Sequence, residues 1–337
     1  MKKLLERYMS STSTVVRRTV VMIALVIVTA ACEHKPLCWH HPHTGMLKVD
    51  FAWWDAPQGE ELVSSMALYV YPRNGDAIKR IDFPGTAGGI IELMVGDYDF
   101  LCLNSDTETL LYENTDKHTT FSIYTRDAHP LSGMEVRADG DFNLSDDYET
   151  IKRAEGTENE RVSRECEDAY GHAVEAIHVH GDPGVMQVVT MYPKMLTVHV
   201  HVIIEDVACL NIVEKISGTL SGLSGRVRVA DSKRIGEHNI VPFSLLPTDE
   251  TTLEGYFVTF GHCPEDVKKF HKLAVYAVTE DDDHRFFEYD VTTQVEEAPN
   301  QRYITIIVKG LDICGMKDMG VVVDPWAPIP PIIVPML

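Results

Sequence analysis

The chain has 337 residues, of which 51 are acidic and 30 are basic, and its formal net charge at pH 7 is −21. An acidic surface repels phosphate backbones, so the composition excludes nucleic acid as an expected partner. The length is enough for two domains that each bury a core of their own.

The N-terminal segment has the pattern of a secretory signal. Basic residues, the last of them Arg17 and Arg18, precede the uncharged run Thr19–Ala31, which ends in small side chains before Cys32. As a helix this run would measure about 20 Å, which is shorter than the ~30 Å hydrocarbon core of a bilayer. A permanent membrane span is therefore the weaker interpretation, and we predict a signal peptide over residues 1–31.

The residues around Cys32 predict lipidation. The sequence VTAAC resembles a bacterial lipobox, in which small residues admit the peptidase and the cysteine thiol takes a diacylglycerol. The alternative is ordinary cleavage after Ala31, with an incidental cysteine. With two or three acyl chains on Cys32, the protein would be stably attached to a membrane through its N-terminal lipid.

Residues 32–45 are predicted to be a tether that leads into the first strand. They contain two prolines, a glycine and a cluster of histidines, but a flexible leader lacks the carboxylates that orient metal-binding imidazoles. Met46–Trp54 then alternates between apolar and polar residues, which predicts a half-buried strand. We expect Trp53 to face the core and Trp54 to face outward. Trp54 is the one aromatic residue we single out for ligand contact, and packing at the edge of a sandwich is the alternative.

The next segments predict strands at the spacing of a β-sandwich. They are short apolar runs bounded by turn residues such as those of Pro72–Gly75. No ten-residue helical pattern alternates with them, which favours antiparallel layers over a parallel α/β sheet. The one longer helical pattern is Glu158–Val174, which we predict to be a helix. The expected strands are Met66–Tyr71, Ile90–Val95, Tyr98–Leu103 and Phe121–Tyr124.

One group of metal-ligating residue types follows these strands. His178, His180 and Asp182 resemble part of the HxHxDH run of metallo-β-lactamase-like hydrolases, but Pro183 stands where that run has a further histidine. A zinc site normally needs three or four protein ligands. The partial set therefore predicts neither a hydrolase nor a bound cofactor.

A second pair of histidines lies in the clearest alternation of the chain, Val198–Ile204. Side chains at i and i+2 of a strand project together, so His199 and His201 could supply two zinc ligands. No third ligand can be named, and we prefer a pair of partly exposed strand histidines. The glycine-containing segment Lys215–Val229 is predicted to be a bent surface connection between strands. Later expected strands are Val241–Leu245, Gly255–Phe260, Lys272–Thr279, Arg285–Val291 and Arg302–Val308.

Six cysteines remain after Cys32, and they show no tight spacing typical of a metal site. An exported chain meets an oxidising compartment, so some of them can pair, and six cysteines allow fifteen complete pairings. The sequence does not choose among these pairings. Cys102 and Cys209 lie in or beside apolar runs, where a free buried thiol is at least as well supported as a disulfide.

Several stretches together resemble the fimbrillin-like lipoproteins of Bacteroides-type bacteria. They are ACEHKPLCWHHPH, DFAWWDAP, YDFLCLNSDTE, and YPKMLTVHVHVIIEDV leading to ISGTLSGLSG. Members of this group are similar to anchor and minor subunits of type V pili. The resemblance implies an all-β fold of two successive transthyretin-like antiparallel β-sandwich domains, without catalysis. It also implies fimbrial subunits as partners and a lipid-anchored, surface-exposed location at the outer membrane.

The resemblance and the strand spacing both place a domain boundary near residue 190. We expect an N-terminal sandwich over residues 46–189, a C-terminal sandwich over residues 190–324 and a proline-rich tail over residues 325–337. Proline removes backbone donors, so this tail is expected to be a poor donor strand. We therefore expect the chain to receive a strand from a neighbouring subunit or to cap a fibre. The Met46–Trp54 strand is expected either to flank the receiving groove or to be a permanently paired interior strand.

Two classes of function remain open. The first is a non-enzymatic fimbrial anchor, minor subunit or adhesin-like surface component. The second is a lipid-anchored surface protein that binds a glycan or a metal, which is motivated by Trp54 and by the fifteen histidines of the chain. Co-purification with fimbrial subunits would separate the two, because only the first class predicts it.

Overall fold

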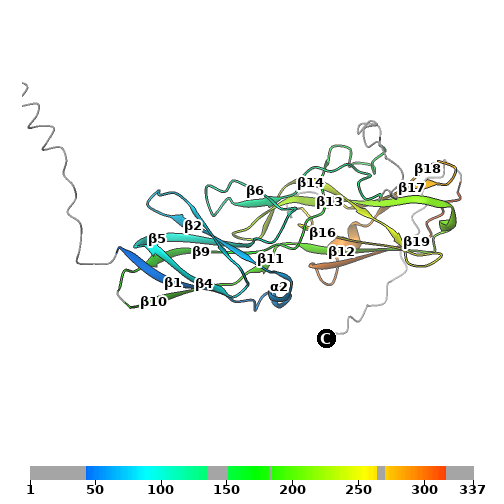
Figure 1. The fold of residues 1–337 in the computed structure, drawn as a ribbon. Helices are drawn as coiled ribbons and strands as arrows, with labels where there is room; N and C mark the ends of the chain where they lie inside the picture. Colours follow the sequence, from blue (N-terminus) through cyan, green and yellow to red (C-terminus); the bar gives the residue numbers. More distant parts are fainter. Residues whose placement is uncertain (1–42, 135–150, 183, 264–269, 316–337) are drawn as a thin grey trace, which may run out of the picture. The chain divides into compact units, whose positions relative to one another are not determined.

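A computed structural model describes residues 43–134, 151–182, 184–263 and 270–315 (Figure 1). The chain divides into two units, Met1–His43 and Thr44–Leu337, so every described residue after His43 belongs to the second unit. Strands dominate the described part of that unit, and the two α-helices described there, α2 (Pro57–Leu62) and α3 (Thr292–Glu296), are short. None of the helices in the described ranges is long and apolar enough to cross a membrane. The all-β prediction is confirmed.

Two sheets form the first β-sandwich. A three-stranded sheet has the order β10-β1-β4, and a five-stranded sheet has the order β11-β9-β5-β2-β3. In β1, Leu47 and Val49 are fully buried while Met46 and Lys48 are exposed, so the alternation of the sequence sets the inward face. Burying one such aliphatic side chain stabilises the fold by roughly 1.5 to 3 kcal/mol. The strands are β1 (Thr44–Phe51), β2 (Met66–Pro72), β3 (Lys79–Phe83), β4 (Gly88–Met94), β5 (Gly96–Asn104), β9 (Tyr170–Val179), β10 (Met186–Met191) and β11 (Lys194–Met195).

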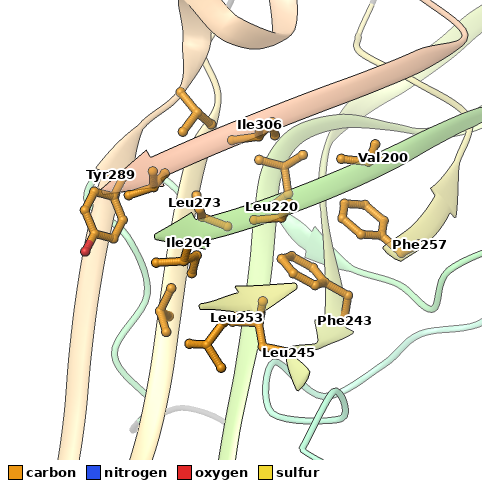
Figure 2. Packing of buried hydrophobic residues seen from close by; sticks show 14 of the residues in the cluster. Val200, Ile204, Leu220, Phe243, Leu245, Leu253, Phe257, Leu273, Tyr289 and Ile306 are labelled. Carbon is orange, nitrogen blue, oxygen red and sulfur yellow. The ribbon is translucent and has the colours of Figure 1, made fainter. Parts of the chain in front are cut away.

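The second β-sandwich joins a four-stranded sheet, β15-β16-β12-β19, to a seven-stranded sheet that contains the path β18-β17-β13-β14-β8. Figure 2 shows Val200 and Ile204 from β12 packed against residues such as Leu220 and Phe243 of the larger sheet. The strands are β6 (Leu111–Glu113), β7 (Ser122–Tyr124), β8 (Arg161–Val162), β12 (Val198–Glu205), β13 (Val213–Arg228), β14 (Lys233–Ser244), β15 (Leu246–Pro247), β16 (Leu253–Thr259), β17 (Lys272–Thr279), β18 (His284–Asp290) and β19 (Tyr303–Lys309); a 3-10 helix, η1 (Leu210–Ile212), precedes β13.

A third apolar cluster covers the other face of β2 and β5. Tyr69 and Leu101 from these strands pack in one cluster with Phe121, Val227 and Phe260. Both faces of β2 and β5 are therefore buried, which explains why these strands are almost continuously apolar in sequence. The strands β7 and β8, which precede residue 189, pair with β13 and β14. The domain division at residues 189 and 190 stays a prediction.

Most strand pairs in the described ranges are antiparallel, and the parallel ones are β1 with β10, β12 with β19 and β14 with β8. Two expectations about local structure are wrong. The segment Glu158–Val174 is not a helix, since β8 and the start of β9 lie within it. The glycine-containing segment Lys215–Val229 is not a surface connection. Most of it belongs to β13, which pairs with β14 and β17 and is largely buried.

The five cysteines in the described ranges divide into one disulfide and three buried thiols. Cys209 and Cys314 form a disulfide, and their Cα atoms are 5.7 Å apart. The sequence alone supports a free thiol at Cys209 at least as well as a disulfide. Cys102, Cys166 and Cys263 are free and buried. Burial raises the pKa of the Cys102 thiol to about 12, so this thiol is unreactive at neutral pH. Cys38 lies outside the described residues.

Candidate functional site

The first group of metal-ligand candidates lies at one end of β9. The rings of His178 and His180 are 4.4 Å apart between centroids, and His178 Nδ1 is hydrogen-bonded to Asp97 Oδ1 at 2.7 Å. Asp182 follows in a turn in which its carbonyl accepts a hydrogen bond from the Val185 amide. In the described ranges, the only group of three or more potential ligands close enough to share a metal ion is Cys209, Asp312 and Cys314. Its two sulfur atoms are already joined to each other.

The structure places His199 and His201 on the outward face of the four-stranded sheet. The pairing register sets His201 between Tyr256 of β16 and Thr305 of β19, and sets His199 beside Tyr303 of β19. Each imidazole stacks on its neighbouring tyrosine, with centroids 4.0 Å apart for His201 and Tyr256 and 5.2 Å apart for His199 and Tyr303. Cross-strand neighbours on one face of a sheet are close enough for such contacts.

Each of these histidines has a carboxylate partner of its own. His199 Nε2 donates to Asp168 Oδ1 at 2.8 Å, and His201 Nε2 donates to Glu254 Oε2 at 2.8 Å. The hydroxyl of Tyr256 also donates to Glu254 Oε2, at 2.7 Å. The hydrogen bonds from Tyr256 and then His201 lower the pKa of Glu254, and the bond to Glu254 raises the pKa of the Tyr256 hydroxyl. The two imidazoles are thus held by different carboxylates and do not converge on one ion.

The histidines and tyrosines surround a hollow of about 330 Å³. Its lining combines aromatic rings with hydrogen-bonding groups, and Glu165 and Thr305 complete its polar part. Tyr256 is 65% exposed, so much of its ring remains accessible. Such a surface can stack on an apolar face of a ligand while its carboxylates and imidazoles bind hydroxyl groups. Sequence reasoning found the histidines and missed the tyrosines, although alternation in β16 and β19 could have placed them on the same face.

The two tryptophans at the end of β1 have opposite environments. Trp53 is buried, its indole Nε1 donates to the Thr86 carbonyl at 3.0 Å, and its ring contacts Tyr170. Trp54 is 83% exposed and lies near Tyr192. Trp54 does not line the hollow beside His201. Its contact with a ligand stays a prediction, and the lipidation candidate Cys32 lies outside the described residues.

Comparisons with known proteins give a family match and a curated relative. A family model described as a domain of unknown function (DUF5119) matches residues 31–244. A curated relative, the "Putative fimbrium anchoring subunit Fim4B" of Bacteroides ovatus, is 24% identical over 116 residues. The match covers 34% of this chain and 33% of the relative, so the chain aligns with about a third of that protein's length.

Solved structures resemble this one at low sequence identity, and the fold is shared with the first of the two that follow. The crystal structure of a "putative adhesin" from Bacteroides ovatus has a TM-score of 0.56 and 16% identity, and the match covers 86% of this chain and 95% of that one. The fimbrial anchor protein Mfa2 of Porphyromonas gingivalis has a TM-score of 0.45 and 11% identity, over 78% of this chain and 90% of that one. The resemblance to fimbrial anchor subunits that the sequence indicates is confirmed.

Proposed function

We propose that this chain, which belongs to the family described as a domain of unknown function (DUF5119), is a non-enzymatic fimbrial subunit attached to the bacterial outer membrane through a lipid on Cys32. The observation that carries the proposal is the sequence match to a fimbrium anchoring subunit. The fold shared with a protein described as a "putative adhesin" supports it. The lipobox-like sequence before Cys32 supplies the means of attachment.

Open sheet edges support assembly with other subunits by strand addition. In the described ranges, β4 and β10 each pair with one strand only, which is β1. An edge strand presents unpaired backbone donors and acceptors that an extended segment of a partner can use. β1 is an interior strand, so the edges that can receive a partner's strand in this sheet belong to β4 and β10. We propose that a neighbouring fimbrial subunit supplies that strand.

The lipid anchor is tested by Cys32→Ala, expressed as the full chain in a bacterium that processes lipoproteins. Wild type should incorporate labelled palmitate and sediment with the membranes. Cys32→Ala should lose the label and remain unprocessed or appear in the soluble fraction, because no other residue would carry the acyl chains. Cys38→Ala is the matched control, since it removes a cysteine from the same leader and should leave labelling unchanged. Palmitate labelling of the Cys32→Ala variant would show that Cys32 is not the residue that carries the lipid.

The fimbrial role is tested separately with the same strains. When surface fimbriae are sheared off and a tagged wild-type chain is captured, fimbrial subunits should co-purify with it. If the chain is acylated but no fimbrial subunit co-purifies with it, the lipid anchor is supported and the fimbrial role is contradicted.

A second candidate function is glycan binding, which the hollow beside His201 favours. Exposed tyrosine rings next to carboxylates and imidazoles are the groups that bind a sugar ring by stacking and by hydrogen bonds to its hydroxyls. The two imidazoles are already held in place by hydrogen bonds to Asp168 and Glu254, so little ordering of these histidines would be needed on binding.

Tyr256→Ala tests this second function on an array of neutral oligosaccharides. A stacking contact contributes on the order of 1 kcal/mol, so the variant should bind about fivefold more weakly than wild type. Tyr192→Ala is the control, because Tyr192 is a partly exposed tyrosine outside the hollow. Equal binding by wild type and Tyr256→Ala, or no binding by either, would count against the glycan site.

A further inference from the structure

The outward face of the three-stranded sheet is unusually apolar. Its exposed side chains include five large apolar residues, each between 43% and 59% exposed. They come from all three strands of the sheet and are Met46, Ile90, Met94, Met186 and Val188. We call these five residues the apolar face. Monomeric soluble proteins rarely leave such side chains together in water without a binding role.

The pairing register gathers most of this face at one end of the sheet. Thr44, the first residue of β1, is opposite Met94 of β4, and Met46 is opposite Met186 of β10. Val95 and Val185, which lie directly beyond these strand ends, are also exposed. The exposed apolar side chains therefore cluster where the chain enters β1 from its N-terminal leader.

The polar groups within the face are paired with one another. Lys48 Nζ lies 2.9 Å from Asp50 Oδ1, and the Thr44 hydroxyl donates to Glu92 Oε1. Removing a polar group from water costs less free energy when the group already has a hydrogen-bond or ion-pair partner in the protein. Lys48 and Asp50 therefore offset each other's charge when the face is covered, whereas Glu92, whose partner is a neutral hydroxyl, has to stay among the polar lipid headgroups.

We propose that the apolar face docks onto the lipid surface of the membrane to which the chain is anchored. This inference rests on the proposed lipid on Cys32. Twelve residue steps separate Cys32 from Thr44 and span at most about 40 Å when fully extended. The anchor therefore holds this end of the sheet close to the bilayer, and a short tether makes the second contact effectively intramolecular.

The chemistry of the face fits a lipid surface better than a shaped protein groove. Three of its five side chains are methionines, which are flexible and can adapt to an irregular apolar surface. The chain is strongly acidic, and Asp97 lies at the same end of the first sandwich, where it pairs with His178 and where the His180 carbonyl approaches Gly45. Anionic headgroups would be repelled, so the lipid we infer is neutral overall, such as a zwitterionic phospholipid.

The test places a small fluorophore on the full acylated chain at Val188→Cys or, as a control, at Asp82→Cys. Asp82 is an exposed residue of the edge strand β3 in the opposite sheet. The chains are reconstituted into phosphatidylcholine and phosphatidylethanolamine vesicles that contain a lipid-borne quencher. We expect quenching at position 188 and little at position 82. Adding Met46→Glu and Ile90→Glu should abolish the quenching at position 188 while the chain stays on the vesicles.

The outcomes separate the inference from the proposed anchor, because acylation is scored by mass in each sample. A chain that carries no lipid on Cys32 overturns the anchor and this inference with it. A lipid-bearing chain with equal quenching at positions 188 and 82 overturns the docking alone. If the fluorescence at position 188 changes only when fimbrial subunits are added, the apolar face binds a protein partner. That result would also overturn the inference of membrane docking.

Discussion

Replacing Cys209 and Cys314 together by alanine should lower the free energy of unfolding by about 4 to 5 kcal/mol. The two cysteines are 105 residues apart, so their disulfide closes a long loop in the unfolded chain and removes much of its conformational freedom. The bridge also joins the segment after β12 to the segment after β19, two strands that pair in parallel. Losing it would release the C-terminal end of the second sandwich.

The measurement is urea unfolding of the purified chain, followed by a signal from the second sandwich. Wild type with dithiothreitol should unfold at the same urea concentration as the double variant, and the reductant should not change the variant further. Cys102→Ala is a control for cysteine removal as such, because Cys102 is a free thiol and cannot contribute through a disulfide. A wild-type chain that is insensitive to reductant, together with a double variant of wild-type stability, would contradict the prediction.

The strands that the sequence predicts well are those with one buried and one exposed face. β1 and β12 alternate because only one of their faces meets a core, and alternation is the signal that sequence reasoning can detect. β13 is different. It is buried over most of its length between β14 and β17, and its glycines provide close packing and bulges in an interior strand. Glycine in sequence predicts a turn more often than a central strand, so the sequence pattern was misleading there.

The candidate site was predictable only in part, because its residues come from separate strands. His199 and His201 share a face of one strand, and the period of two in β12 places them together without any tertiary knowledge. Tyr256 and Tyr303 reach them only through the pairing of β12 with β16 on one side and with β19 on the other. The parallel pairing with β19 joins segments about a hundred residues apart, and a single sequence carries no signal for such a register. The disulfide depends on the same long-range pairing.

Gly222→Ala should lower the free energy of unfolding by about 3 to 5 kcal/mol, for two independent reasons. Gly222 has a φ of +75°, a left-handed conformation that disfavours a side chain. A Cβ atom at this position would also lie 1.8 Å from the Phe270 carbonyl oxygen and 2.8 Å from His271 Nδ1. The backbone of β13 bulges here, between the pairs Leu220 with Val241 and Leu223 with Asn239. The Gly222 amide donates to the buried Glu160 carboxylate, so the strand cannot shift without breaking that bond.

Gly75→Ala separates the conformational penalty from the clash. Gly75 has a similar φ of +86°, but a Cβ atom there would meet nothing within 4 Å. Gly75→Ala should therefore lose only about 1 to 2 kcal/mol, the cost of a left-handed backbone with a side chain. Urea unfolding of the two variants and wild type measures both losses under the same conditions. Equal losses of stability in the two variants would contradict the predicted clash at Gly222, because Gly75 has the same backbone conformation without the close contacts to Phe270 and His271.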